Sequence, residues 1–377
     1  MRRSVIILLL IGIIITVFCG CHNSNTAGSE PVSMEDGTIS EQETDEPTIF
    51  DQIVAGEIVN ELGSMFDFSQ IIKVQEYYAV GACVYGENEL MVLYAGDECS
   101  AVMVYDISTG KEKKRIEMDI ALSLLAKPVC VSKEFSYICE AEGKFIYLDW
   151  KNKKYEEVIL DNVPESYLML GEGESIYYTV EDDCNVYVYI YGSERCYSVY
   201  DGSDALDSLE LEYLVYAGTS IIITVESEGY SGYALLDLEM QELTVFDSLA
   251  GELIYCDKEY IYTSPEKPNS ILLYDPMTPR VSKEFRIENN EEIKDLIFYK
   301  NEGQFLTKVT EDEDTVIRLY DLEAGILKNC IVIPKEYLVD KVECFPNSSC
   351  VYIEGRTDKG EYIPLIWNTD IIDEILE

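Results

Sequence analysis

Histidine is nearly absent from this sequence, since the one residue of this type is His22, close to the amino terminus. A Ser-His-Asp or Cys-His catalytic arrangement in the rest of the chain is thereby excluded, and so is zinc held by histidine. No phosphate-binding P-loop, no Gly-x-Gly-x-x-Gly turn, no His-Glu-x-x-His and no Cys-x-x-Cys occurs either. We expect a protein that is not an enzyme and that has no cofactor and no metal site; paired carboxylates are the remaining route to acid–base catalysis.

Basic residues are scarce as well. The chain has 28 Lys and Arg against 72 Asp and Glu, which gives a formal net charge of −44. Binding to nucleic acid depends on Lys and Arg that neutralise phosphates, so a nucleic-acid partner is excluded. The acidic runs Glu181–Asp183 and Glu311–Asp314 offer oxygen ligands for calcium but lack the spacing of a calcium loop, and we interpret them as solvated hairpin tips.

The amino terminus has the layout of an export signal. Arg2 and Arg3 precede an apolar run from Val5 to Phe18, which is short for a membrane span of about 20 residues. The Gly20-Cys21 junction resembles the lipobox of bacterial lipoproteins, and this resemblance implies cleavage before Cys21 and a lipid on Cys21. We predict a signal peptide over residues 1–20 and a lipid-anchored protein on the extracytoplasmic face of the cell membrane. The alternatives are an uncleaved helical anchor and a plain secreted protein.

Residues 21–47 differ sharply in composition from what precedes them. They are rich in Asn, Ser, Thr, Gly, Glu and Asp and contain no Lys or Arg. Such a segment buries too little apolar surface to offset the entropy of ordering it. We predict a disordered acidic tether that spans on the order of 25–30 Å as a flexible coil.

From residue 48 the chain repeats one unit, an apolar strand that ends in Asp or Asn and leads through a turn into another strand. The copies of this Asp-ended or Asn-ended strand, which is the third strand of each predicted blade, are Val102–Asp106, Phe145–Asp149, Tyr197–Asp201, Tyr233–Asp237, Ile271–Asp275, Val316–Asp321 and Leu365–Asn368. The intervals match the roughly 40–50 residues of a four-stranded propeller blade. We interpret the terminal Asp as a turn residue that accepts backbone N–H groups.

The Tyr105–Lys111 stretch and its copies resemble the repeats of YVTN and WD40-like propellers. The resemblance implies an all-β fold over residues 48–377, a seven-bladed β-propeller of four-stranded antiparallel blades. It implies no ligand, because the Gly-His and Trp-Asp pairs of WD40 repeats and the Trp-rich repeat of quinone-binding propellers are absent. The third blade is the least regular, and residues 49–77 either complete the last blade or stand outside it.

Two basic runs follow the third strands of the first two predicted blades. The first run contains Lys111, Lys113, Lys114 and Arg115, and the second contains Lys151, Lys153 and Lys154. Equivalent turns of neighbouring blades emerge on one face, so we predict a patch for an anionic surface or polymer. The alternative is charge balance with acidic neighbours.

Ten of the twelve cysteines lie after residue 48. Outside the cytoplasm they would tend to pair, and the predicted bridges are Cys130 with Cys139 and Cys344 with Cys350. Fully reduced cysteines are the alternative, since several lie in apolar strands as small core residues.

The leading functional hypothesis is a cell-surface binding or scaffolding module for an envelope protein, a peptide or a glycan, attached to the membrane through its lipid. An accessory subunit of an envelope transport or assembly complex is the second hypothesis. A carboxylate-based hydrolase or lyase is the third. The 29 tyrosines are compatible with stacking on sugars, but we attribute them first to sheet faces whose hydroxyl groups reach water.

Overall fold

The computed structural model describes residues 64–130, 132–140, 144–160, 164, strand segments between 167 and 321, and 324–371. The chain separates into two compact units, Met1–Glu46 and Pro47–Glu377, and all described residues belong to the second. The predicted signal peptide, Cys21 and the tether lie outside the described residues. No helix in the described part of the chain combines the length and the apolar character that crossing a membrane requires.

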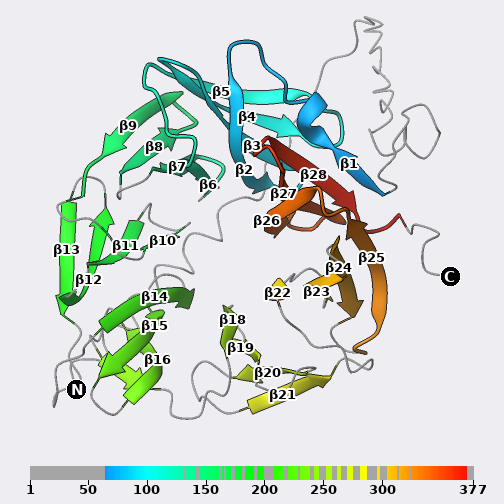
Figure 1. Cartoon of the computed structure of the whole chain (residues 1–377). Helices are drawn as coiled ribbons and strands as arrows, with labels where there is room; N and C mark the ends of the chain where they lie inside the picture. Colours follow the sequence, from blue (N-terminus) through cyan, green and yellow to red (C-terminus); the bar gives the residue numbers. More distant parts are fainter. Residues whose placement is uncertain are drawn as a thin grey trace, which may run out of the picture. The chain divides into compact units, whose positions relative to one another are not determined.

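The described residues form seven antiparallel sheets of four strands each, and the strands of the first six sheets pair in chain order (Figure 1). The first sheet contains β2 (Tyr78–Gly86), β3 (Glu89–Ala95), β4 (Ser100–Asp106) and β5 (Glu112–Met118). The second contains β6 (Lys127–Cys130), β7 (Phe135–Cys139), β8 (Phe145–Asp149) and β9 (Lys154–Val158). The third contains β10 (Tyr167–Leu170), β11 (Ser175–Val180), β12 (Asp183–Ile190) and β13 (Ser193–Ser198).

The remaining sheets follow the same plan. The fourth contains β14 (Ser208–Val215), β15 (Ser220–Ser227), β16 (Tyr230–Asp237) and β17 (Glu242–Val245). The fifth contains β18 (Glu252–Cys256), β19 (Ile261–Ser264), β20 (Ser270–Tyr274) and β21 (Val281–Arg286). The sixth contains β22 (Asp295–Ile297), β23 (Gln304–Glu311), β24 (Asp314–Asp321) and β25 (Leu327–Ile333). The last contains β26 (Tyr337–Cys344), β27 (Cys350–Thr357), β28 (Tyr362–Asn368) and β1 (Met65–Asp67).

The last sheet takes its fourth strand from the beginning of the domain. β1 pairs antiparallel with β28, with Met65 opposite Trp367. The short 3-10 helix η1 (Phe68–Gln70) then turns the chain toward β2, and Asp67 caps η1 by accepting the backbone N–H of Ser69 at 2.8 Å. Of the two possibilities left open for residues 49–77, part of this segment completes the last sheet.

Apolar clusters connect neighbouring sheets. One cluster joins the last sheet to the first through Phe68, Tyr94, Tyr352 and Ile366, all fully buried. Further clusters join the first sheet to the second, the second to the third, and the sixth to the last. The inner strand β3 is buried along almost its whole length, because sheets pack on both of its faces, whereas the outer strand β5 is exposed at Glu112, Lys113 and Glu117.

The predicted repeat is confirmed in six of its seven copies. The strands β4, β8, β16, β20, β24 and β28 coincide with the predicted Asp-ended or Asn-ended strands, and each is the third strand of its sheet. In the third sheet the prediction is wrong, because the equivalent strand is β12, and residues 193–198 form the next strand, β13. The prediction of this strand relied on a terminal Asp, and β12 ends at Ile190 without one.

The Asp turns act as predicted. Asp106 Oδ1 accepts the backbone N–H groups of Ser108 at 3.0 Å and of Thr109 at 2.9 Å. Asp149 accepts the N–H of Asn152 at 2.9 Å, and Asp321 accepts that of Ala324 at 2.8 Å. Burial alone would raise the pKa of Asp106, but the hydrogen bonds from Thr109 and the Lys113 ammonium outweigh it and lower that pKa.

The two predicted disulfides are wrong. None of Cys130, Cys139, Cys344 and Cys350 forms a disulfide. Cys139 lies opposite Lys127, three residues before Cys130, and Cys344 lies opposite Val351 rather than Cys350. Because side chains alternate between the faces of a strand, each predicted pair points to opposite faces of its sheet.

Candidate binding pocket

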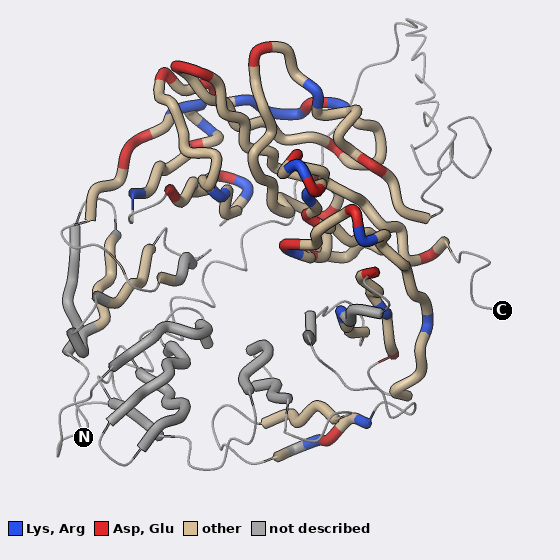
Figure 2. The backbone as a smooth tube through the Cα atoms, viewed as in Figure 1, with Lys and Arg blue, Asp and Glu red and all other residues tan. Residues whose placement is uncertain are grey.

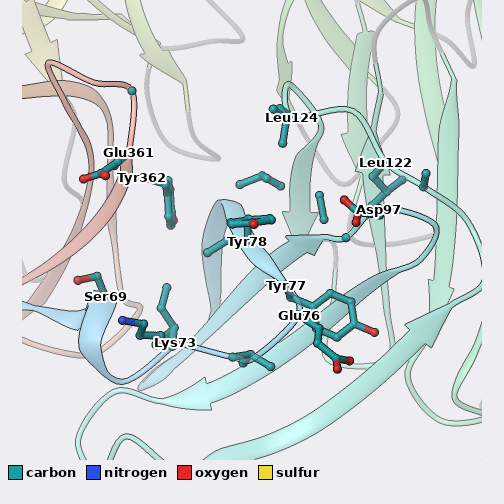
Figure 3. Close-up of a pocket in the computed structure, with 18 of the residues that line it drawn as sticks. Ser69, Lys73, Glu76, Tyr77, Tyr78, Asp97, Leu122, Leu124, Glu361 and Tyr362 are labelled. Atoms are coloured by element: carbon teal, nitrogen blue, oxygen red, sulfur yellow. The ribbon is translucent and has the colours of Figure 1, made fainter.

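A pocket of about 910 Å3 lies where the last sheet meets the first. Its lining comes from four segments: residues 69–80 between η1 and the start of β2, the β3–β4 turn at 95–97, the β5–β6 connection at 121–124, and residues 356–362 at the β27–β28 turn. In a four-stranded antiparallel sheet, the connection into the first strand and the turn between the second and third strands lie at the same end of the strands. The pocket therefore combines connections that are far apart in the sequence (Figure 3).

Large apolar side chains are exposed at this pocket. Tyr78 is 72% exposed and Leu124 is 65% exposed, although both belong to types that usually prefer the interior. Figure 3 shows Tyr78 in the middle of the lining residues, with Glu361 and Tyr362 to one side and Asp97 and Leu122 to the other. Leu125, the next residue in the sequence, is 74% exposed but does not line the pocket.

Tyr77 supports the wall beside Tyr78. Its ring meets the ring of buried Tyr94 edge to face, with centroids 6.3 Å apart. The Cys99 thiol donates to the Tyr77 hydroxyl at 3.6 Å, and this bond, followed by burial, raises the pKa of Tyr77 to about 12. Tyr77 therefore stays a neutral phenol at physiological pH.

The backbone around Glu76 is held in a conformation that is unusual for a residue with a side chain. Glu76 has a φ of 75°, in the left-handed region. Its carbonyl lies close to Gly96, where an added Cβ would be 3.3 Å from Glu76 O and 3.0 Å from Cys99 O. The β3–β4 turn thus needs a glycine so that the Glu76–Tyr78 segment can lie against it.

Arg356 lines the pocket and bridges the two sheets. Its guanidinium donates to Asp340 at 2.8 Å, lies 3.8 Å from Glu354, and donates to the carbonyl of Val80 in β2 at 3.4 Å. Its guanidinium also lies 5.9 Å from the centre of the Tyr362 ring. Arg356 therefore has its charge compensated from within the last sheet while it binds the first.

A second polar contact between the same sheets lies deeper. Glu343 accepts the backbone N–H of Val84 at 2.9 Å and pairs with Lys341 at 2.5 Å. Burial raises the pKa of Glu354, and the Tyr352 hydroxyl, which donates to it at 2.8 Å, offsets this effect only in part. Glu343 therefore links the two sheets directly, and both carboxylates are occupied by protein partners.

The turns that carry or precede the predicted basic residues lie at the end of the strands opposite to the pocket. The β4–β5 turn carries Lys111 and leads to Lys113, Lys114 and Arg115, and the β8–β9 turn carries Lys151 and Lys153 before Lys154 begins β9. The Lys114 ammonium, near the start of β5, lies 5.9 Å from the centre of the Trp150 ring, which follows β8 directly.

Acidic positions lie close to several of these basic positions along the backbone (Figure 2). Lys113 pairs with Asp106 at 3.2 Å, and Arg115 lies between Glu112 at 2.6 Å and Glu117 at 3.2 Å. The Lys114 ammonium donates to the Tyr85 hydroxyl at 2.8 Å. The anionic-surface patch stays a prediction, with much of its charge balanced locally.

No cluster of three or more His, Cys, Asp or Glu side chains suited to a metal ion occurs among the described residues. Sequence reasoning missed the pocket, because its residues come from four connections whose proximity depends on closure of the last sheet onto the first. Two local signals pointed to it: Tyr77-Tyr78 directly at the start of a strand, and Leu124-Leu125 inside a connection.

No family model and no curated protein matches this sequence. Among solved structures, the chain is similar to the beta-propeller domain of Cps50 (Swd1) from Myceliophteria thermophila, with a TM-score of 0.51 and 12% sequence identity. The match covers 78% of this chain and 97% of that one. At this identity the similarity shows the fold alone. Together with the seven four-stranded sheets and the closing strand β1, it shows that the chain folds as an all-β propeller.

Proposed function

We propose that the protein is a non-catalytic binding module, anchored by a lipid on Cys21 to the extracytoplasmic face of the membrane, that engages a protein partner through the pocket at the last and first sheets. The observation that carries the proposal is the exposure of Tyr78 and Leu124 in the lining of a pocket of about 910 Å3. Exposed apolar patches beside a hollow mark interaction sites on proteins that are otherwise well covered by polar groups.

The amino-terminal sequence supports the location. Arg2, Arg3 and the apolar run to Phe18 form an export signal that ends before Cys21, and the acidic segment to residue 47 suits a tether between a lipid and a folded domain. A tethered binding module samples partners within reach of the membrane at a raised effective concentration. An accessory subunit of an envelope transport or assembly complex would bind in the same way, but to one dedicated membrane partner.

Site-specific photocrosslinking of the full chain in its native membranes tests the proposal. A benzoylphenylalanine in place of Tyr78 should give a discrete adduct with a partner protein, and the same group in place of Lys151, in the exposed turn at the opposite edge, should not. Leu124→Asp, which places a charge on the apolar wall, should reduce the Tyr78 adduct. Adducts from position 151 alone, or a Tyr78 adduct indifferent to Leu124→Asp, would show that the pocket is not the binding face.

A further inference from the structure

The rim of the pocket carries three carboxylates from three different segments. Glu76 precedes β2, Asp97 lies in the β3–β4 turn, and Glu361 lies in the β27–β28 turn. All three are exposed, and none forms an ion pair with another described residue. Lys73 is the one lysine among the lining residues. The rim therefore has an excess of negative charge that no ion pair among the described residues neutralises.

The other cation of the lining, Arg356, does not compensate these acids. Its guanidinium is committed to Asp340 at 2.8 Å and to Glu354 at 3.8 Å, and it also donates to the Val80 carbonyl. Moving it to the rim would leave Glu354, which is 9% exposed, without its cation. The negative rim is for this reason a fixed property of the pocket.

The acids surround an aromatic and aliphatic surface. Tyr78 is 72% exposed between Asp97 and Glu361, and Leu124 adds an aliphatic wall (Figure 3). A tyrosine face attracts a Lys or Arg cation, and the aliphatic stems of these side chains pack on apolar surface. The Glu76–Tyr78 segment lies against the β3–β4 turn at Gly96, and this packing favours a surface that is ordered before a ligand binds.

From this charge and surface we infer that the pocket binds a basic, apolar segment of a partner protein, in which Lys or Arg pairs with Glu76, Asp97 and Glu361 while an adjacent apolar side chain covers Tyr78 and Leu124. The inference rests on the proposed function and specifies its ligand class. The negative charge of the rim repels an anionic ligand. A neutral glycan has no positive charge to pair with the three carboxylates. A bare metal ion does not fit, since no group of three or more metal-ligating side chains occurs among the described residues.

Defined peptides test the ligand class on the full chain in a mild non-ionic detergent. The probe is fluorescein-labelled Gly-Lys-Trp-Lys-Gly, compared with the acidic Gly-Glu-Trp-Glu-Gly and the neutral Gly-Gln-Trp-Gln-Gly by fluorescence anisotropy. We expect the basic peptide to bind at least tenfold more tightly than the acidic one, and 0.5 M salt to weaken it because exposed charges are screened. Glu76→Gln, Asp97→Asn and Glu361→Gln together should weaken the basic peptide about tenfold, and Tyr78→Ala should weaken all peptides.

A matched variant controls for the net charge of −44, which attracts any cation. Gln at the exposed positions Glu87, Glu134 and Glu156, away from the pocket, removes the same number of charges and should leave the affinity within about twofold. Equal weakening by both triple variants, or equal binding of basic and acidic peptides, overturns the inference. If the Tyr78 crosslink to a partner persists in that case, the proposed function stands with another ligand class; if the crosslink also fails, both fall.

Discussion

A glycine in the sixth sheet offers a test of how closely neighbouring sheets approach. Gly325, in the β24–β25 turn, has a φ of 66° and donates its N–H to Asp321 O at 2.9 Å. A Cβ at this position would lie 2.6 Å from the carbonyl oxygen of Arg286, at the end of β21 in the fifth sheet. Real Cβ atoms do not come so close to backbone oxygen, so Gly325→Ala forces the two sheets to shift.

The β27–β28 turn supplies the matched control. Gly360 has a φ of 78°, but a Cβ there meets nothing within 4 Å. Gly360→Ala therefore reports the left-handed strain alone, about 1–2 kcal/mol, reduced by about 0.5–1 kcal/mol because alanine loses less freedom on folding. Gly325→Ala adds the cost of displacing packed backbone, roughly 1–3 kcal/mol. We expect Gly325→Ala to destabilise the domain by about 2–4 kcal/mol and Gly360→Ala by about 1 kcal/mol.

Urea denaturation followed by the fluorescence of Trp150 and Trp367, together with thermal melting, measures both variants against the unmodified chain. For a domain of this size, 1 kcal/mol corresponds to roughly 2 °C in Tm. The Tm of Gly325→Ala should accordingly lie several degrees below that of Gly360→Ala. Equal midpoints for the two variants would refute the argument that the fifth and sixth sheets touch through backbone at this turn.

Three further predictions concern single positions. Lys153 has a φ of 52° at the turn position that Gly110 occupies in the first sheet, so Lys153→Gly should raise the free energy of unfolding by up to about 1 kcal/mol in urea titration; an unchanged or lower midpoint contradicts this. Burial raises the pKa of Glu354 above its ordinary 4.5, so the contribution of this side chain to stability is complete below pH 4.5 and is lost as the pH rises through the folded pKa. The Tm of Glu354→Gln should not show this loss between pH 4 and 8. A variant Tm that stays parallel to that of the unmodified chain over this range would contradict the prediction. Cys21→Ser should abolish incorporation of labelled palmitate and release the protein from membranes, whereas Cys19→Ser should leave both unchanged; retained labelling in Cys21→Ser would remove the proposed anchor.

The strands were predictable because each carries its own local signal. Apolar runs rich in Val, Ile, Leu or Tyr mark β4 and β24, and an Asp whose side chain accepts turn N–H groups marks where such a strand ends. The third sheet shows the limit of this signal. Its β12 ends at Ile190 without an Asp, and the nearest Asp-ended apolar stretch begins inside the next strand.

Contacts between residues distant in the sequence were not predictable in the same way. Whether Cys130 and Cys139 face each other depends on strand register, and a one-residue change in register moves a side chain to the other face. The pocket depends on contacts such as Arg356 with the Val80 carbonyl, which join the two ends of the domain. Neither composition nor local pattern carries that information.

The pairing of β1 with β28 sets the order in which this domain can finish folding. Met65 and Trp367 are about 300 residues apart in the sequence, so a chain made from its amino terminus presents β1 first and its partner last. Until β28 arrives, β1 has no strand to pair with, and until β1 pairs, the last sheet has an open edge able to join strands of other chains. Closure is therefore a single late event of high contact order, and the three residues Met65–Asp67 wait longest for the strand with which they pair.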